Sequence, residues 1–227
     1  MKPAMTPETI NRAIAAAGLA MRGVADLTDE ERSGALAGKR QVVLIGLVGR
    51  LGWDAFARSA EAADGAPHPL DRWSRRVLGD LAAELGALAL FPFGDPPFWP
   101  FQRWAMRAEP LHPSPLGLLI HPEHGLWHSY RGALAFADEI VLAAPEATPS
   151  PCESCSQKPC LSTCPVEAFS ALGYDVGRCT DWLRSQNGGD CMARGCRARA
   201  ACPVAPDLAH RPDQAGFGMQ AFLAARD

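Results

Sequence analysis

All eight cysteines of this 227-residue chain lie between Cys152 and Cys202. They form two runs, Cys152-x2-Cys155-x4-Cys160-x3-Cys164-Pro165 and Cys179-x11-Cys191-x4-Cys196-x5-Cys202-Pro203. In each run a proline follows the fourth cysteine, where it fixes the backbone and supplies no N–H group. A segment this rich in thiols is stabilised either by a metal centre that the thiolates bind or by disulfide bonds between the cysteines.

The first run resembles the C-x2-C-x2-C-x3-C-P run of two-cluster bacterial ferredoxins, in which the fourth cysteine binds the other cluster. It has two extra residues between its second and third cysteines, and the second run is stretched further. Eight thiolates satisfy two [4Fe–4S] clusters, because each cluster takes four. The resemblance implies one cluster on Cys152, Cys155, Cys160 and Cys202, and the other on Cys164, Cys179, Cys191 and Cys196.

Two other uses of the cysteines stay open. Disulfides need an oxidising compartment, and the N-terminal segment is a poor signal peptide because Asn11 and Arg12 interrupt its apolar stretch. Zinc prefers paired C-x2-C knuckles, and only Cys152 and Cys155 have that spacing. Because no stretch of about 18 apolar residues occurs, we expect a cytoplasmic protein with no membrane span.

The net charge of −3 gives no general attraction to nucleic acids or anionic membranes, so we expect no nucleic-acid partner. Five arginines nevertheless surround the second cysteine run: Arg178, Arg184, Arg194, Arg197 and Arg199. One interpretation is charge compensation for anionic clusters and thiolates, which raises the reduction potential. Solvated loop charges and an RNA-contacting surface are the two other interpretations.

A proline-punctuated connector over 145–151 divides the chain into a cysteine-free domain, 1–144, and a cysteine-bearing domain, 145–227. In the first domain Thr6 and Pro7 start a helix, and apolar residues from Leu70 to Leu85 form a helical stripe. Strands are expected over 41–48, 87–91, 117–120 and 133–142. Helices alternating with buried strands predict an α+β class with a layered first domain.

Two further segments are candidates for a ligand site. Six aromatic side chains lie between Phe91 and Trp104, although aromatics make up only 7% of the chain. That segment either lines a pocket for a flat ligand or is pinned to the core by its own rings. His121, His124 and His128 fall close together, without the carboxylates that would complete a metal site.

The string His121-Pro122-x-x-Gly125-x-Trp127-x-x-x-Arg131-Gly132 resembles the H-P-x-x-G-x-W-x-x-x-R-G segment of CblC-type cobalamin-processing proteins. The resemblance implies a nitroreductase-like α/β layered N-terminal domain that binds cobalamin. Such a domain followed by a ferredoxin-like domain is also similar to the order in epoxyqueuosine reductases. By this resemblance Trp127 and Arg131 lie at the cofactor pocket, and His121 and Trp99 are further cofactor-binding candidates.

These features predict an iron–sulfur redox protein whose two [4Fe–4S] clusters pass electrons to a corrinoid, as in a corrinoid-dependent oxidoreductase. The first alternative is a ferredoxin-like electron carrier with an accessory docking domain and no bound substrate. The second is a zinc-stabilised interaction module. Both redox hypotheses require an electron donor or acceptor protein as partner. No persuasive nucleophile arrangement or nucleotide-binding motif occurs, so no catalytic residue is assigned.

Overall fold

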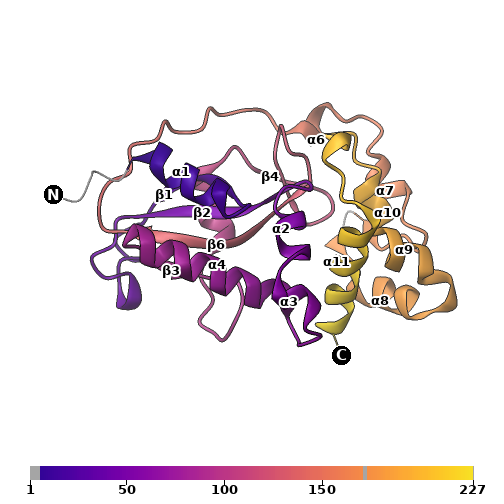
Figure 1. The fold of residues 1–227 in the computed structure, drawn as a ribbon. Helices are drawn as coiled ribbons and strands as arrows, with labels where there is room; N and C mark the ends of the chain where they lie inside the picture. Colours follow the sequence, from indigo (N-terminus) through magenta and orange to yellow (C-terminus); the bar gives the residue numbers. More distant parts are fainter. Residues whose placement is uncertain (1–5, 171–172, 227) are drawn as a thin grey trace. The chain divides into compact units, whose positions relative to one another are not determined.

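The structure is a computed structural model that describes residues 6–170 and 173–226, and the chain forms two compact units (Figure 1). The first unit comprises the described residues through Pro110 together with His128–Ala147. The second comprises Leu111–Trp127 and the described residues from Thr148 onward. The segment 111–127 therefore belongs with the cysteines, which a single division of the chain near residue 145 does not anticipate.

The first unit is built on a four-stranded antiparallel sheet in the order β1–β2–β6–β3. Its strands are β1 (Ala20–Asp26), β2 (Gln41–Val48), β6 (His128–Phe136) and β3 (Leu88–Leu90). Every residue of β2 is buried, as its continuous apolar run predicts for a strand covered on both faces. β6 begins and ends several residues before the expected strand over 133–142, and β1 was not predicted.

Two irregularities interrupt this sheet. The register between β1 and β2 shifts between Met21 and Val24, and that between β2 and β6 shifts at Ile45 and Gly46. At the second shift a Cβ on Gly46 would come within 2.0 Å of the carbonyl oxygen of Ser129, so only glycine fits there. Such bulges bend a strand and change the direction of its side chains, and Arg22 and Arg131 lie within them.

Three helices, α1 (Pro7–Ala16), α4 (Pro69–Leu85) and α5 (Phe101–Ala108), pack against the sheet, and Figure 1 shows α4 running along it. α1 starts where the sequence predicts, since the Thr6 side chain accepts the N–H of Thr9. α4 ends at Gly86, which adopts φ +69°. The remaining elements of the unit are η1 (Gly34–Leu36), α2 (Trp53–Ala57) and α3 (Ala60–Ala63).

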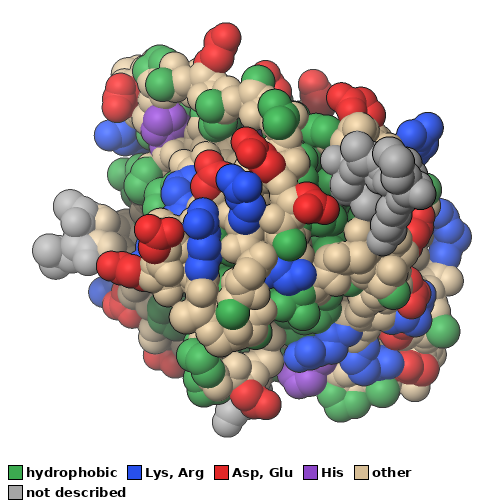
Figure 2. Space-filling model, turned by 90° about the vertical axis from the view of Figure 1, so that its left-hand side faces the viewer, with side chains coloured by type: hydrophobic (Ala, Val, Ile, Leu, Met, Phe, Trp, Pro, Cys, Tyr) green, Lys and Arg blue, Asp and Glu red, His purple; other side chains and the backbone are tan. Residues whose placement is uncertain are grey.

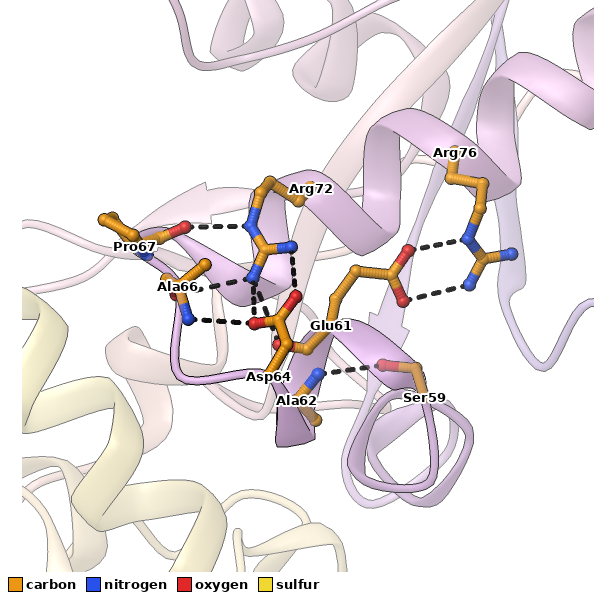
Figure 3. Close-up of polar contacts among 8 residues, drawn as sticks. All are labelled: Ser59, Glu61, Ala62, Asp64, Ala66, Pro67, Arg72 and Arg76. Carbon is orange, nitrogen blue, oxygen red and sulfur yellow. Dashed lines mark hydrogen bonds and ion pairs between the residues drawn. The ribbon is translucent and has the colours of Figure 1, made fainter.

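Ion pairs tie α3 and the turn after it to α4 (Figure 3). The guanidinium of Arg76 donates to both oxygens of Glu61, at 2.6 and 3.1 Å. Arg72 binds both oxygens of Asp64, each at 2.7 Å, and also the carbonyl oxygen of Pro67 at 2.9 Å. Paired donors of this kind fix the orientation of an arginine as well as its position.

The second unit consists of short helices and two small hairpins. Its elements are β4 (His112–Pro113), β5 (Leu119–Ile120), α6 (Pro151–Ser154), α7 (Pro159–Ser162), β7 (Phe169–Ser170), β8 (Gly173–Tyr174), α8 (Val176–Arg184), η2 (Gln186–Gly188), α9 (Gly189–Arg194), α10 (Arg197–Ala200), η3 (Pro206–Leu208) and α11 (Pro212–Ala224). The strand expected over 117–120 is β5, and it pairs with β4 rather than with the sheet of the first unit.

The expectation of a mixed α and β class is confirmed, whereas the nitroreductase-like and ferredoxin-like natures of the two parts stay predictions. Within the described residues no helix has the length and apolar character needed to cross a membrane. On the face seen in Figure 2, basic and acidic side chains lie interspersed, in keeping with the small net charge.

Candidate metal centre

All eight cysteines carry free thiols and lie in the second unit, on its short helices or directly beside them. Ser150 caps α6 and accepts the N–H of Cys152, and Asp175 caps α8 ahead of Cys179. Cys196 is the first residue before α10, and Cys202 follows that helix closely. Short capped helices thus set the direction of thiols that come from distant parts of the sequence.

Four of these thiols form a first group. Burial raises the pKa of Cys152, and the negative charges of Cys202 and Cys155 raise it further. The pKa of Cys160 is also raised, first by burial and then by Cys202, Cys152 and Cys155. These four side chains therefore lie within electrostatic range of one another, and Cys202 comes from the second run.

The other four form a second group. Burial raises the pKa of Cys179, the hydroxyl of Tyr174 opposes this, and Cys164 and Cys191 raise it again. The pKa of Cys196 is raised by burial and by Cys179 and Cys164, against two backbone N–H groups that lower it. Cys164, from the first run, thus acts electrostatically on two cysteines of the second run, and the partition between two clusters stays a prediction.

The donor set fits a cluster better than a single ion. In the described part of the chain no three His, Cys, Asp or Glu side chains are close enough together to hold one metal ion. Zinc would require four sulfurs at about 2.3 Å from one centre. The four thiolates of a [4Fe–4S] cluster bind four different irons and lie further apart. Two groups of four thiols that interact over a longer range suit the second arrangement.

A buried apolar group packs against five of the eight cysteines. Leu116, Ile120 and Leu126, all from the segment 111–127, form a buried group with Phe169, Ala198 and Cys202. Against that group pack Cys152, Cys160, Leu161, Cys164, Tyr174, Cys196 and Val204. The segment that sequence analysis placed in the first domain therefore supplies part of the cover over the cysteines. Exclusion of water by such a group influences the potential of a metal centre.

His121 is a buried member of a tight turn in this segment. Its Nδ1 accepts the backbone N–H groups of Glu123 at 3.0 Å and His124 at 3.3 Å, and its ring stacks on that of His124 at 4.2 Å. Gly125 closes the turn with φ +57°, and a Cβ there would lie 2.3 Å from the carbonyl oxygen of Val204. The motif residues His121 and Gly125 thus shape a turn that lies against the chain after Cys202.

Trp127 is buried in the same unit. The guanidinium carbon of Arg199 lies 5.0 Å from the centre of its ring, and the ring of His210 lies 5.5 Å away at a steep angle. Arg199 also donates a hydrogen bond to the carbonyl oxygen of Leu126. Burial, together with the charge of Arg199, lowers the pKa of His210 to about 3, so this imidazole is neutral at physiological pH.

The two other cofactor-binding candidates belong to the first unit. Arg131 donates to Asp71 and, at 3.1 Å, to Ser74, and its guanidinium carbon lies 5.3 Å from the centre of the Phe93 ring. Trp99 stacks on Trp104 at 6.1 Å. The four candidates thus fall into two pairs, one in each unit.

Trp99 also lines a cavity of about 250 Å³ in the first unit. The aromatic segment supplies most of its wall, including Phe91, Phe93 and Phe98, and Arg75 completes it. The guanidinium carbon of Arg75 lies 5.1 Å from the ring centre of Phe91 and 5.2 Å from that of Phe93. The aromatic segment therefore does both things that its composition allows, since some rings line a cavity while Phe101 and Trp104 are buried in the core.

Two features could not be found from the sequence: the buried group of Arg22, Glu109 and Tyr130, and the contact of Trp127 with His210. Arg22 and Glu109 form a buried ion pair joined by Tyr130, and no local motif marks these three residues. His210 was not singled out, because nothing in the sequence near it indicates contact with Trp127. Arg199 did carry a signal, as one of the five arginines around the second cysteine run.

Comparison with known proteins gives little beyond this geometry. No protein-family model and no curated protein matches the chain. One solved structure that resembles it is a crystal structure of epoxyqueuosine reductase with an epoxyqueuosine-modified stem loop of tyrosine tRNA. Its TM-score is 0.47 at 15% sequence identity, and the alignment covers 92% of this chain and 69% of that one.

That complex corrects one expectation from the sequence. The small negative net charge suggested that no nucleic acid is a partner, yet the similar solved protein is bound to a tRNA stem loop. Net charge averages over the whole surface, whereas phosphate contacts depend on local arginines and lysines. The exclusion of a nucleic-acid partner on the basis of net charge was therefore wrong.

Proposed function

We propose that this chain is an iron–sulfur redox protein with two [4Fe–4S] clusters in its second unit. One cluster is held by Cys152, Cys155, Cys160 and Cys202, and the other by Cys164, Cys179, Cys191 and Cys196. The observation that supports the proposal is that eight free thiols lie on or beside the short helices of one unit, and the effects of the thiols on one another's pKa fall within two sets of four. Each group contains one cysteine from the other run, as cluster exchange between two runs requires.

The clusters would supply one-electron transfer, and the chain would bind them and control their surroundings. Thiolates are soft ligands suited to iron in such clusters. The apolar residues of the segment 111–127 pack with Cys202 and against four other cysteines, and would shield part of a bound cluster from water. The N–H groups of Ala198 and Arg199 lower the pKa of Cys196 and so favour its thiolate form, although burial opposes them.

Purification without oxygen, followed by assay of iron and acid-labile sulfide, tests the proposal. We expect about eight irons and about eight sulfides per chain, with a brown colour that dithionite bleaches. An electron paramagnetic resonance signal from reduced clusters should appear after dithionite. Stoichiometric zinc without sulfide would instead support the zinc-stabilised module, and disulfides in place of metal would also contradict the proposal.

Electron transfer to a corrinoid is a second candidate, favoured by the aromatic wall of the cavity that includes Trp99. Its volume of about 250 Å³ is below the roughly 300–1,000 Å³ typical of pockets for drug-sized ligands. A corrinoid is larger than such ligands, so only part of it would enter this cavity. The ferredoxin-like carrier, which needs no corrinoid, therefore remains the simpler form of the proposal.

Anaerobic titration with hydroxocobalamin separates these two forms. A saturable change in the corrinoid spectrum, weakened by Trp99→Ala, would support corrinoid binding at the aromatic cavity. Phe222→Ala is the control, because Phe222 lies on α11 in the second unit and does not line that cavity. An unchanged spectrum at high protein concentration, with clusters intact, would leave the carrier form.

A further inference from the structure

Of the five arginines around the second cysteine run, Arg199 alone is held against the interior of the described second unit. Arg178 pairs with Asp175 at 3.8 Å, and Arg194 and Arg197 both pair with Asp190, at 3.7 and 2.9 Å. Arg184 bonds to the carbonyl oxygen of Arg226. These four side chains therefore have hydrogen-bond or ion-pair partners near the surface. The fifth arginine, Arg199, lies on α10.

Arg199 carries a positive charge that no carboxylate offsets among the described residues. Its guanidinium bonds to the carbonyl oxygen of Leu126 and lies over the Trp127 ring, while its buried Nε finds no hydrogen-bond partner in the part of the chain that the structure describes. Cys196 is the N-cap residue of α10, the helix that carries Arg199, so this cation lies within one helical turn of a proposed cluster ligand. A half-buried cation of this kind is costly unless it interacts with a negative charge.

We propose that Arg199 raises the reduction potential of the cluster held by Cys164, Cys179, Cys191 and Cys196. The inference rests on the proposed function, because it concerns a cluster at that site. Reduction adds one electron, and so one negative charge, to the cluster. A fixed cation in a region of low dielectric stabilises the reduced form more than the oxidised form.

The segment 111–127 fixes the place of this charge. The carbonyl of Leu126 accepts a guanidinium N–H, and the face of Trp127 attracts the cation at 5.0 Å. The ring of His210 also lies against Trp127, and its pKa is lowered to about 3, so it adds no second charge at neutral pH. Leu126 and Trp127 are 73 and 72 residues away from Arg199 in the sequence, so a distant segment holds the guanidinium in place.

The test is a potentiometric titration with dithionite, followed by electron paramagnetic resonance, on full-length proteins with matched iron and sulfide content. In Arg199→Gln we expect one of the two potentials to become more negative by about 59 mV or more, a tenfold fall in the one-electron equilibrium constant. Arg199→Lys keeps the charge and should retain most of the potential. Arg197→Gln removes a neighbouring arginine that Asp190 already offsets, and should leave both potentials nearly unchanged.

A second pair of variants covers the case in which Arg199→Gln fails to bind clusters. Trp127→Leu removes the ring that holds the guanidinium and should lower the same potential, whereas Trp127→Phe keeps an aromatic face. Equal potentials in cluster-loaded wild type and Arg199→Gln, or in both Trp127 variants, would overturn the inference while leaving the proposed function intact. Absence of iron and sulfide from the wild-type protein would overturn the proposed function as well.

Discussion

The Nε of Arg22 donates a 2.7 Å hydrogen bond to Oε1 of Glu109, and both side chains are almost completely buried in the first unit. Tyr130 donates its hydroxyl proton to the other oxygen of Glu109, and its ring centre lies 5.4 Å from the guanidinium carbon of Arg22. Burial nevertheless raises the pKa of Glu109 despite these partners. The two terminal nitrogens of Arg22 have no hydrogen-bond partner among the described residues.

Removing one member of this ion pair should destabilise the protein more than replacing both members by apolar residues. Arg22→Met or Glu109→Leu alone leaves a buried charge without its partner, and each should lower the free energy of unfolding by about 3–5 kcal/mol. The double variant removes both charges and should lose less than either single variant. Urea denaturation followed by tryptophan fluorescence would measure the coupling, and losses that simply add would show that the two side chains do not depend on each other.

The proposed exchange of cysteines between the two runs predicts which Cys→Ser substitutions remove the same cluster. Cys164→Ser should remove the same cluster as Cys179→Ser, although Cys164 belongs to the first run. Cys202→Ser should remove the same cluster as Cys160→Ser. Each variant should retain about four irons, because four thiolates remain for the other cluster.

Electron paramagnetic resonance of the reduced variants checks this partition. Spectra that group Cys164 with Cys179, and Cys202 with Cys160, agree with it. Spectra that instead group Cys164 with Cys160 would show that each run binds its own cluster.

Gly125 and Gly117 offer a matched comparison in the segment 111–127. Both adopt positive φ, at +57° and +73°, but a Cβ on Gly117 meets no atom within 4 Å, whereas one on Gly125 would lie 2.3 Å from the carbonyl oxygen of Val204. Gly117→Ala should cost only the backbone strain, about 1–2 kcal/mol. Gly125→Ala adds a steric clash and should cost roughly 3 kcal/mol or more.

Denaturation of the two alanine variants, with iron retention measured in parallel, tests this difference. We expect Gly125→Ala to lose iron faster, because the turn lies against the apolar group that packs against the cysteines. Equal stability of the two variants would contradict this prediction, because it would mean that the backbone at Val204 shifts to relieve the clash without loss of stability.

Local patterns in the sequence predicted those parts of the fold that local chemistry determines. Thr6 and Pro7 begin α1, Gly86 ends α4, and the apolar run over 41–48 is β2, because a cap, a left-handed glycine and a continuous apolar stretch each act within a few residues. β1 was missed because Gly23, at φ +101° within the bulge between Met21 and Val24, breaks the alternation that indicates a strand.

The arrangement of the candidate site depends on contacts between distant residues. The spacing of the cysteines and the prolines after them predicts that Cys164 and Cys202 exchange groups, and this stays a prediction. The contact of Leu126 and Trp127 with Arg199 could not be predicted, because no pattern in either segment refers to the other. For the same reason the sequence could not predict that the motif's two ends, His121 and Arg131, belong to different units.

The ion pairs between α3 and α4 predict a dependence of stability on pH (Figure 3). The hydrogen bonds from Arg76 lower the pKa of Glu61 from 4.5 to about 2. A carboxyl whose pKa is lower in the folded state stabilises the protein above the pKa of the unfolded state, and this contribution is lost as pH falls toward the folded value. Glu61→Gln should therefore be less stable than wild type at pH 7, and the difference should shrink between pH 4.5 and pH 2.

Urea midpoints of wild type and Glu61→Gln at pH 7 and at about pH 3 would measure this change. Arg76→Met provides the control, because Glu61→Gln should then have little further effect at either pH. A stability difference that stays constant over this range, or that persists in the Arg76→Met background, would show that the pair with Arg76 is not what lowers the pKa of Glu61.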